Sequence, residues 1–138
     1  MRFWDSSALV PLILNEPTTF AMRRLLMSDR HIVASWLTPV EITSALWRRR
    51  HHDELDATAH HEADSSFAQI SKRWTATPAA EVIDRAIDLL GRHSLRAADS
   101  VQLASALFAA SRFGWLPFVT LDRDLAAAAR TEGFTVIP

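Results

Sequence analysis

Four acidic residues of this sequence stand where carboxylates could act together on a substrate. Asp5 follows a short apolar stretch at the start of the chain and precedes an apolar helical segment. Glu41 and Asp99 fall in the first turns of two expected helices, and Asp122 directly follows the apolar run Phe118–Leu121. Grouped carboxylates bind Mg²⁺ or Mn²⁺ through oxygen. Because such ions activate water for attack on phosphorus, these residue types point to phosphodiester hydrolysis.

The elements that must position these acids are short strands alternating with helix-length segments. Apolar runs predict strands at Arg2–Trp4, His31–Ala34, Thr75–Pro78, Phe118–Leu121 and Phe134–Ile137. Helical spacing and stop signals predict helices at Ser7–Leu14, Thr18–Ser28, Thr38 to about His52, Asp53–Trp74, Glu81–His93, Ala97–Phe113 and an alanine-rich stretch after Asp122. This alternation predicts one three-layer α/β/α domain over residues 1–138, with a central, mostly parallel sheet.

The predicted fold would bring the acids to one place. In a parallel sheet all strands end at one edge, and open α/β folds bind ligands in the crevice outside that edge. Each acid also has a purely structural explanation. Asp5 and Asp122 could be helix N-caps, Glu41 could complete a capping box with Thr38, and Asp99 could interact only with its helix dipole.

Convergence of all four acids would carry an electrostatic cost. At about 7 Å separation and an effective dielectric constant of about 20, each ionised pair costs about 2 kcal/mol. Six such pairs would cost on the order of 10 kcal/mol, which is comparable to the stability of a whole domain. Partial protonation could relieve part of this repulsion, but a bound divalent cation relieves it far better. We therefore expect Mg²⁺ or Mn²⁺ at the site.

Composition narrows the class of protein. The chain has 138 residues, 49% of them apolar, a formal net charge of −1 and no cysteine. The lack of cysteine excludes disulfides, thiolate catalysis and zinc–thiolate sites. The longest apolar run, Ala8–Leu14, is far shorter than the ~20 residues of a membrane span. We therefore expect a soluble, cytoplasmic protein with no membrane partner.

Four sequence blocks resemble the PIN-domain nucleases, and in particular the VapC-type toxins of prokaryotic toxin–antitoxin pairs. The blocks are "WDSSALV", "TPVEITSALWR", "LRAADSVQLASAL" and "FVTLDRDLAAAARTEGFTVIP", which together span nearly the whole chain. The resemblance implies metal coordination, and with it catalysis, by Asp5, Glu41, Asp99 and Asp122. It also implies that Ser6 contacts a metal-bound water or a phosphate, although a helix N-cap explains this serine equally well.

The resemblance further implies an activity and partners. Members of the family are Mg²⁺-dependent endoribonucleases, often on structured RNA such as tRNA or rRNA loops. They usually form homodimers and are blocked by a cognate VapB-type antitoxin. Asp124 competes with Asp122 for the fourth acidic position, and we favour Asp122 because it directly follows the strand. Arg96 is close enough in sequence to Asp99 for a role in the site.

Other interpretations of the same residues remain open. Asp122 and Asp124 after an apolar strand also fit a phosphatase with an aspartyl nucleophile, and a non-catalytic receiver-like module is a third class. Both usually need a lysine in the site, and the only lysine is Lys72, in a helical region.

The basic stretch Trp47–His52 could bind RNA phosphates or simply place cations at a helix C-terminus. Adjacent histidines, as in His51-His52 and His60-His61, diverge on a helix and fit solvation better than zinc binding.

Overall fold

The short apolar runs form the strands of one sheet in the computed structural model, which describes residues 1–138. The strands are β1 (Arg2–Trp4), β2 (Ile32–Ala34), β3 (Trp74–Ala76), β4 (Phe118–Val119) and β5 (Val136–Ile137). Their order is β3-β2-β1-β4-β5, and every neighbouring pair is parallel. The predicted sheet is therefore confirmed, and it is parallel throughout.

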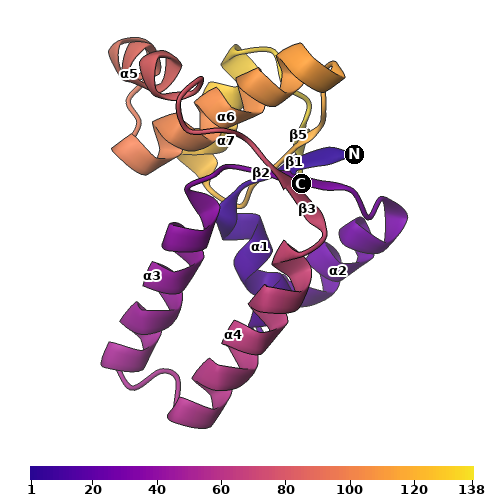
Figure 1. Ribbon diagram of the computed structural model, residues 1–138, viewed down its shortest axis with the longest axis vertical. Coiled ribbons are helices and arrows are strands. Elements are labelled where there is room, and N and C mark those ends of the chain that lie inside the picture. The colour runs from indigo at the N-terminus through magenta and orange to yellow at the C-terminus, as the bar shows by residue number, and fades with distance from the viewer.

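Helices cover both faces of this sheet, as Figure 1 shows. They are α1 (Ser6–Ile13), α2 (Thr19–Ser28), α3 (Thr38–His51), α4 (Ala57–Ser71), α5 (Ile83–Arg92), α6 (Ala97–Phe113) and α7 (Arg123–Thr131). Helices α1 to α4 lie on one side of the strands and α5 to α7 on the other. This confirms the predicted three-layer α/β/α architecture. None of the helices combines the length and the hydropathy that crossing a membrane requires.

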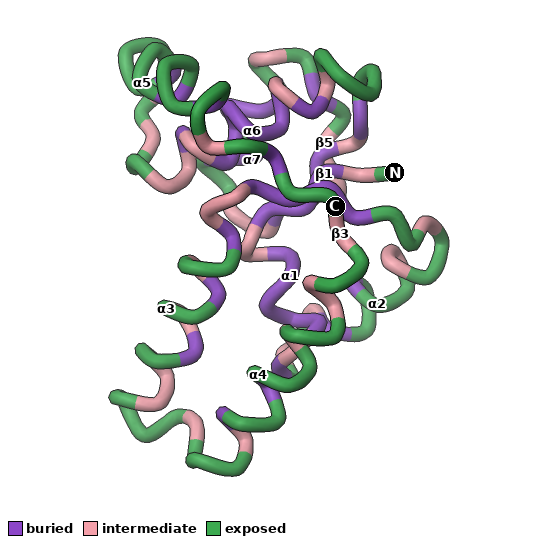
Figure 2. The backbone as a smooth tube through the Cα atoms, in the orientation of Figure 1, coloured by how far each residue is buried: buried purple, intermediate pink, exposed green.

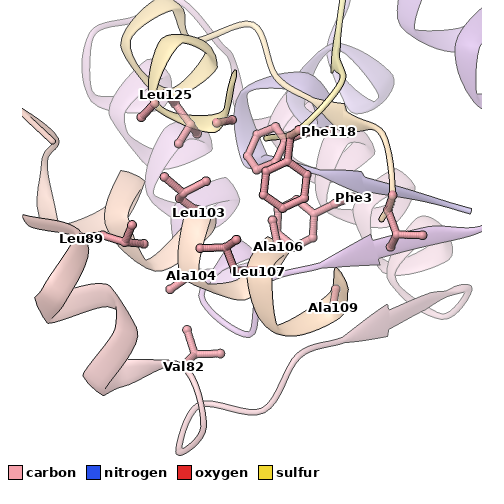
Figure 3. Close-up of a cluster of buried hydrophobic side chains, with 14 of the residues drawn as sticks. Phe3, Val82, Leu89, Leu103, Ala104, Ala106, Leu107, Ala109, Phe118 and Leu125 are labelled. Atoms are coloured by element: carbon pink, nitrogen blue, oxygen red, sulfur yellow. The ribbon is translucent and has the colours of Figure 1, made fainter. Parts of the chain in front are cut away.

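Alternation along the central strands builds two separate cores. Phe3 and Phe118 point to the layer of α5, α6 and α7, where they join Leu103 and Leu125 in a cluster of 16 buried residues (Figure 3). The residues that follow them, Trp4 and Val119, join the second cluster with α1 to α4. Successive strand residues point to opposite faces, so the central strands β2, β1 and β4 each contribute to both cores.

The order of the strands places a switch point beside β1. The chain runs outward from β1 to β2 and β3, then crosses through α5 and α6 to β4 on the other side of β1. Connections therefore leave β1 and β4 toward opposite faces of the sheet. In open α/β sheets this reversal leaves a crevice at the carboxyl ends of the two strands.

Two predicted boundaries differ from the structure because polar side chains cap helices there. The helix expected over Asp53–Trp74 is shorter: Asp53 adopts a positive φ of 56°, and Asp56 caps α4 by accepting from the backbone N–H of Ala59 over 2.7 Å. Trp74 belongs to β3 instead. The strand expected over Phe118–Leu121 ends at Val119, since the chain then turns to let Asp122 cap α7.

The predicted capping box of Thr38 and Glu41 is wrong. Thr38 is the first residue of α3, its hydroxyl accepts a hydrogen bond from Gln102, and the N-cap Leu37 makes no side-chain capping bond. Ser35 instead accepts from the backbone N–H groups of Leu37 and Thr38, over 3.2 and 3.1 Å. The start of α3 is thus fixed by the preceding loop, which frees Glu41 for contacts with another helix.

Helices α3 and α4 form a hairpin that extends beyond the sheet. Figure 1 shows the pair leaving the strands together, and Figure 2 shows that the far end of the hairpin is mostly exposed. Only Ile42 and Leu46 on α3 and His60 and Ala63 on α4 are buried beyond the start of α3. The hairpin therefore contributes few side chains to the core, and residues of α3 lie beside the carboxyl edge of the sheet.

The aromatic packing of β4 gives a prediction for stability. Phe118 is fully buried, with ring centroids 5.2 Å from Phe3 and 5.5 Å from Phe134. Phe118→Ala should lower the free energy of unfolding by about 3–5 kcal/mol, because it removes the ring and leaves a cavity. Urea unfolding measures this, with Phe20→Ala as the matched control at a ring that is 73% exposed. Equal losses in the two variants would show that β4 is not part of the core.

Candidate carboxylate site

A cavity of about 810 Å³ opens at the carboxyl edge of the sheet, beside the switch point. It is bordered by the ends of β1 and β4, by α3 and by the start of α6. The sequence-predicted residues that line it are Asp5, Ser6, Glu41, Arg96, Asp99 and Asp122. The four predicted acids thus reach a single depression from four segments that are remote in sequence, and Glu16 and Glu54 also line it.

Asp5 is the most buried of these acids, with 3% of its surface exposed. Its backbone N–H donates to Val119 O over 2.9 Å, so it continues the pairing of β1 with β4. Its Oδ2 atom caps α1 by accepting from the Ser7 N–H over 3.1 Å. The structure therefore shows that Asp5 is an N-cap and also a cavity residue, so the two explanations of this carboxylate do not exclude each other.

Two hydroxyls that sequence reasoning missed hold Asp5 in place. Both Ser7 Oγ and Thr120 Oγ1 donate to Asp5 Oδ2, the latter over 3.0 Å. Ser7 Oγ also accepts from the Leu121 N–H over 2.9 Å, and Thr120 Oγ1 accepts from the Asp122 N–H over 3.1 Å. These bonds join the ends of β1 and β4. The only sequence signals were the second serine of "DSSAL" and the threonine of "FVTLD".

Burial and hydrogen bonding have opposite effects on the pKa of Asp5. Burial raises the pKa of the Asp5 carboxyl above its usual range, while the donors Ser7 and Thr120 act in the opposite direction. All strong donors act on Oδ2, and Oδ1 has only a 3.4 Å contact from Ser6 Oγ. Oδ2 is thus held by hydrogen bonds within the fold, and Oδ1 is available to a ligand.

Glu41 enters the cavity from α3, and its pKa is raised to about 7. The main cause is burial, and the negative charges of Asp5 and Asp99 add to it. The opposing influences are hydrogen bonds from Gln102 and Ser6. Gln102, on α6, donates from Nε2 to Glu41 Oε2. Sequence reasoning did not single out Gln102, since a lone glutamine in a helix carries no motif.

Asp99 lies at the third position of α6 and closes the start of that helix. Its Oδ2 atom accepts from the Arg96 backbone N–H over 3.3 Å. Burial raises the pKa of Asp99, the charges of Asp122 and Asp124 raise it further, and the Arg96 guanidinium acts against them. Arg96 therefore lies beside the carboxylates, as its spacing from Asp99 suggested.

Asp122 and Asp124 take different positions at the start of α7. Asp122 lines the cavity and caps α7, since its Oδ1 atom accepts from the Leu125 N–H over 2.8 Å. Asp124 instead borders a separate depression of about 260 Å³ with His93 and Thr131. The geometry thus favours Asp122 as the fourth acid, although the charge of Asp124 still reaches Asp99.

The donor set of the cavity fits a hard divalent cation held partly through water. The four acids supply only oxygen. Burial raises the pKa values of Asp5, Glu41 and Asp99, and neighbouring negative charge raises those of Glu41 and Asp99 further. No three histidine, aspartate or glutamate side chains lie close enough together to enclose a cation by themselves. Mg²⁺ characteristically uses one or two carboxylates and keeps several waters. An open cavity with carboxylates on its walls suits that mode of binding.

The remaining charged residues divide between the cavity and the surface. Arg48, Arg49 and His52, from the basic stretch at the end of α3, line the cavity, where Arg49 pairs with Glu16. Lys72 is exposed at the end of α4 and does not line the cavity, so the lysine that phosphatase or receiver chemistry would use is missing there.

The aromatic and histidine side chains of the hairpin have structural contacts. Trp47 is 48% exposed, and its ring packs edge-on against His60, with centroids 4.5 Å apart. His60 is buried and lies 3.6 Å from the carboxylate of Asp64. The histidine pairs do not gather into a group that could hold a metal.

The raised pKa of Glu41 predicts the pH dependence of stability. Because the pKa is higher in the folded than in the unfolded protein, the folded state binds more protons between pH 4.5 and about 7. The stability contributed by the neutral form is present below this window and is lost as pH rises through it. Without divalent cations, stability should fall by about 2 kcal/mol from this group after allowance for solvent screening.

Urea unfolding in EDTA at pH 5 and pH 8 measures the effect. Glu41→Gln should reduce the difference between the two pH values, and the exposed Glu62→Gln should leave it unchanged. An identical pH dependence for Glu41→Gln and the wild type would contradict the assignment.

Comparison with known proteins places this chain in a family. Among models of protein families, the PIN domain matches residues 2–131. The solved structure of Mycobacterium tuberculosis VapC20, described as a sarcin–ricin loop cleaving toxin, shares 22% identity at a TM-score of 0.72, and the match covers 100% of both chains. FitAcB from Neisseria gonorrhoeae shares 15% identity at a TM-score of 0.69, with 100% of this chain and 97% of that chain covered.

Further comparisons agree on the fold. A toxin–antitoxin complex from Klebsiella pneumoniae matches at 15% identity and a TM-score of 0.68, covering 100% of this chain and 97% of that chain. No curated protein matches the sequence. The structural likenesses establish the arrangement of strands and helices, and the family match covers nearly the whole sequence. The chain belongs to the PIN-domain family.

Proposed function

We propose that this protein is a metal-dependent endoribonuclease and the toxin of a VapBC-type toxin–antitoxin pair. The observation that carries the proposal is the meeting of Asp5, Glu41, Asp99 and Asp122 in one cavity at the carboxyl edge of the sheet. Membership of the PIN-domain family and the toxins among the similar structures support it. The substrate would be RNA, such as a tRNA or rRNA loop.

The proposed roles follow from the contacts of each residue. A bound Mg²⁺ or Mn²⁺ ion supplies the positive charge that neutralises the carboxylates and activates water for attack on a phosphodiester. Asp5 would offer Oδ1 to the ion while Ser7 and Thr120 hold Oδ2. Glu41, Asp99 and Asp122 would bind the ion directly or through water.

Two residues beside the acids would act on the substrate. The Ser6 hydroxyl lies against Asp5 and would contact a metal-bound water or the phosphate. Arg96 would neutralise phosphate charge at the cavity mouth, since its guanidinium already acts on Asp99. Arg48 also lines the cavity and, unlike Arg49, makes no ion pair with an acid.

Incubation of the purified protein with total RNA and Mg²⁺ tests the activity. We expect cleavage that EDTA abolishes, and a loss of at least about 100-fold in Asp5→Ala and Asp99→Ala, because each removes a proposed metal ligand. Asp64→Ala, which removes an exposed acid of α4, is the matched control and should retain activity. Cleavage that survives chelation or persists in both variants would refute the proposed site.

The proposed partners are an antitoxin and a second copy of this chain. The antitoxin would be a VapB-type protein that blocks the cavity. For the second copy, α5 offers a row of exposed apolar side chains: Ile83, Ile87 and Leu90 are 45%, 62% and 43% exposed. They recur every three or four residues, so they lie on one side of the helix. An exposed apolar row of this kind is typical of an interface.

The dimer gives a separate prediction. Ile87→Glu should convert a homodimer to a monomer, because it places a charge within an apolar interface. Light scattering after size-exclusion chromatography measures the mass. Arg85→Glu, which changes an exposed residue on another side of α5, should remain dimeric. A monomeric wild-type protein, or a dimeric Ile87→Glu variant, would contradict this interface.

A further inference from the structure

Gln102 is the largest buried polar side chain of α6, a helix whose other buried residues are mostly apolar. It has no exposed surface, and its neighbours on α6, Leu103 and Ala106, belong to the hydrophobic core. A leucine of similar size could fill such a position, and an unpaired buried amide destabilises a fold. The hydrogen-bond partners of this residue therefore indicate what the amide does.

Both partners of the Gln102 amide belong to α3. The Nε2 atom donates to Thr38 Oγ1 over 3.1 Å and to Glu41 Oε2. The other amide atom, Oε1, is buried without a partner. Since both available N–H groups are directed at α3 while the carbonyl remains unpaired, the side chain is arranged around donation to Glu41.

The neighbouring polar residues of α6 show that this contact is part of a polar seam. We use this name for Asp99, Gln102 and Ser105, which are three residues apart and lie on one side of the helix. Ser105 donates to Ser35 Oγ over 2.9 Å, and Asp99 lines the cavity. Within the seam, only Gln102 donates a hydrogen bond to a carboxylate of the cavity.

We propose that Gln102 is a positioning residue that orients the Glu41 carboxylate for binding a divalent cation. The amide holds Oε2, and Thr38 accepts from the other N–H of the amide. Gln102 thus leaves Glu41 Oε1 for the ion, beside the Ser6 hydroxyl that also hydrogen-bonds to this carboxylate. The inference rests on the proposed function, because it requires Glu41 to act toward a metal ion. A glutamate loses side-chain freedom when it binds a cation, and the hydrogen bond removes that freedom in advance.

Metal affinity in the absence of RNA tests this role. Gln102→Met keeps the size of the side chain and removes both N–H donors. Loss of a hydrogen bond that orients a metal ligand typically weakens metal affinity 10–100-fold. We expect the Kd for Mn²⁺, measured by electron paramagnetic resonance titration, to rise by about that factor. The far-ultraviolet circular dichroism spectrum and the melting temperature in EDTA should remain close to those of the wild type.

Ser105→Ala is the matched control for a purely structural role. It also removes a buried hydrogen bond between α6 and the segment leading to α3, but it does not touch Glu41. Its Kd for Mn²⁺ should equal that of the wild type. A fall in Mn²⁺ affinity as large as that of Gln102→Met would show that general coupling of α6 to α3 is responsible, and would overturn the proposal.

A double-mutant cycle isolates the coupling to Glu41. In the Glu41→Gln background, Gln102→Met should cause no further rise in the Kd for Mn²⁺, because the oriented carboxylate is already absent. The same rise in both backgrounds would overturn the proposal.

Thr38→Val supplies a milder variant. It removes one hydrogen-bond acceptor of the Gln102 amide, and it should raise the Kd for Mn²⁺ several-fold. If both Thr38→Val and Gln102→Met bind Mn²⁺ with the Kd of the wild type, the proposal is also refuted.

The experiment separates this inference from the proposed function. A wild-type protein that binds no Mn²⁺ and cleaves no RNA would refute the metal-dependent nuclease and the role of Gln102 with it. A wild-type protein that binds Mn²⁺ and cleaves RNA, with Gln102→Met binding Mn²⁺ equally well, would refute the role of Gln102 alone. At saturating Mg²⁺, Gln102→Met should recover most of the wild-type kcat, whereas Asp5→Ala should not.

Discussion

Repulsion among carboxylates at one edge of the sheet is the constraint that shapes the rest of this site. Burial raises the pKa of Asp5, Glu41 and Asp99, and neighbouring acids add to the shift for Glu41 and Asp99. A fold selected for stability alone would separate such groups or replace them. Here the strand order brings them together, since β1 and β4 are neighbours at the switch point. The cost of grouping them is the physical reason to expect a cation in the cavity.

The fold partly compensates for that cost with hydrogen bonds that also serve its own architecture. Asp5, Asp99 and Asp122 each accept a backbone N–H at the start of a helix. The positive end of the helix dipole stabilises an ionised side chain at the same position. Under the proposed function, the carboxylates that cap these helices would also bind the ion; for Asp5, Oδ2 accepts from the backbone and Oδ1 would serve the ion. A variant of any of them would then change stability and activity together.

Glu41 is the exception among the four, because no helix start requires it. Its backbone lies within the first turn of α3, but its carboxylate accepts a hydrogen bond from Gln102 on α6. The carboxylate of Glu41 is thus held by a side chain of another helix and not by a backbone N–H of its own. The polar seam of α6 therefore links the layer that carries Asp99 to the layer that carries Glu41.

Much of the fold could be predicted from local patterns. Alternation of strands and helices specified the three layers, and Arg2–Trp4 and Ala97–Phe113 formed as predicted to the residue. Boundaries were less accurate where a cap decided them. The helix expected from Asp53 begins only after Asp56, whose carboxylate accepts from Ala59. Local apolar spacing continues past such a point and gives no sign of the cap.

The positions of the acids along the chain were enough to predict where they meet, because residues that follow strands share one edge of a parallel sheet. The way those acids are held depends instead on contacts between distant segments. The Thr120 hydroxyl reaches Asp5 from 115 residues away, and Gln102 reaches Glu41 from 61 residues away. The predicted partnership of Thr38 with Glu41 failed for the same reason: a donor on another helix competed with the local backbone. Such contacts depend on how layers pack, and no periodicity along the chain encodes them.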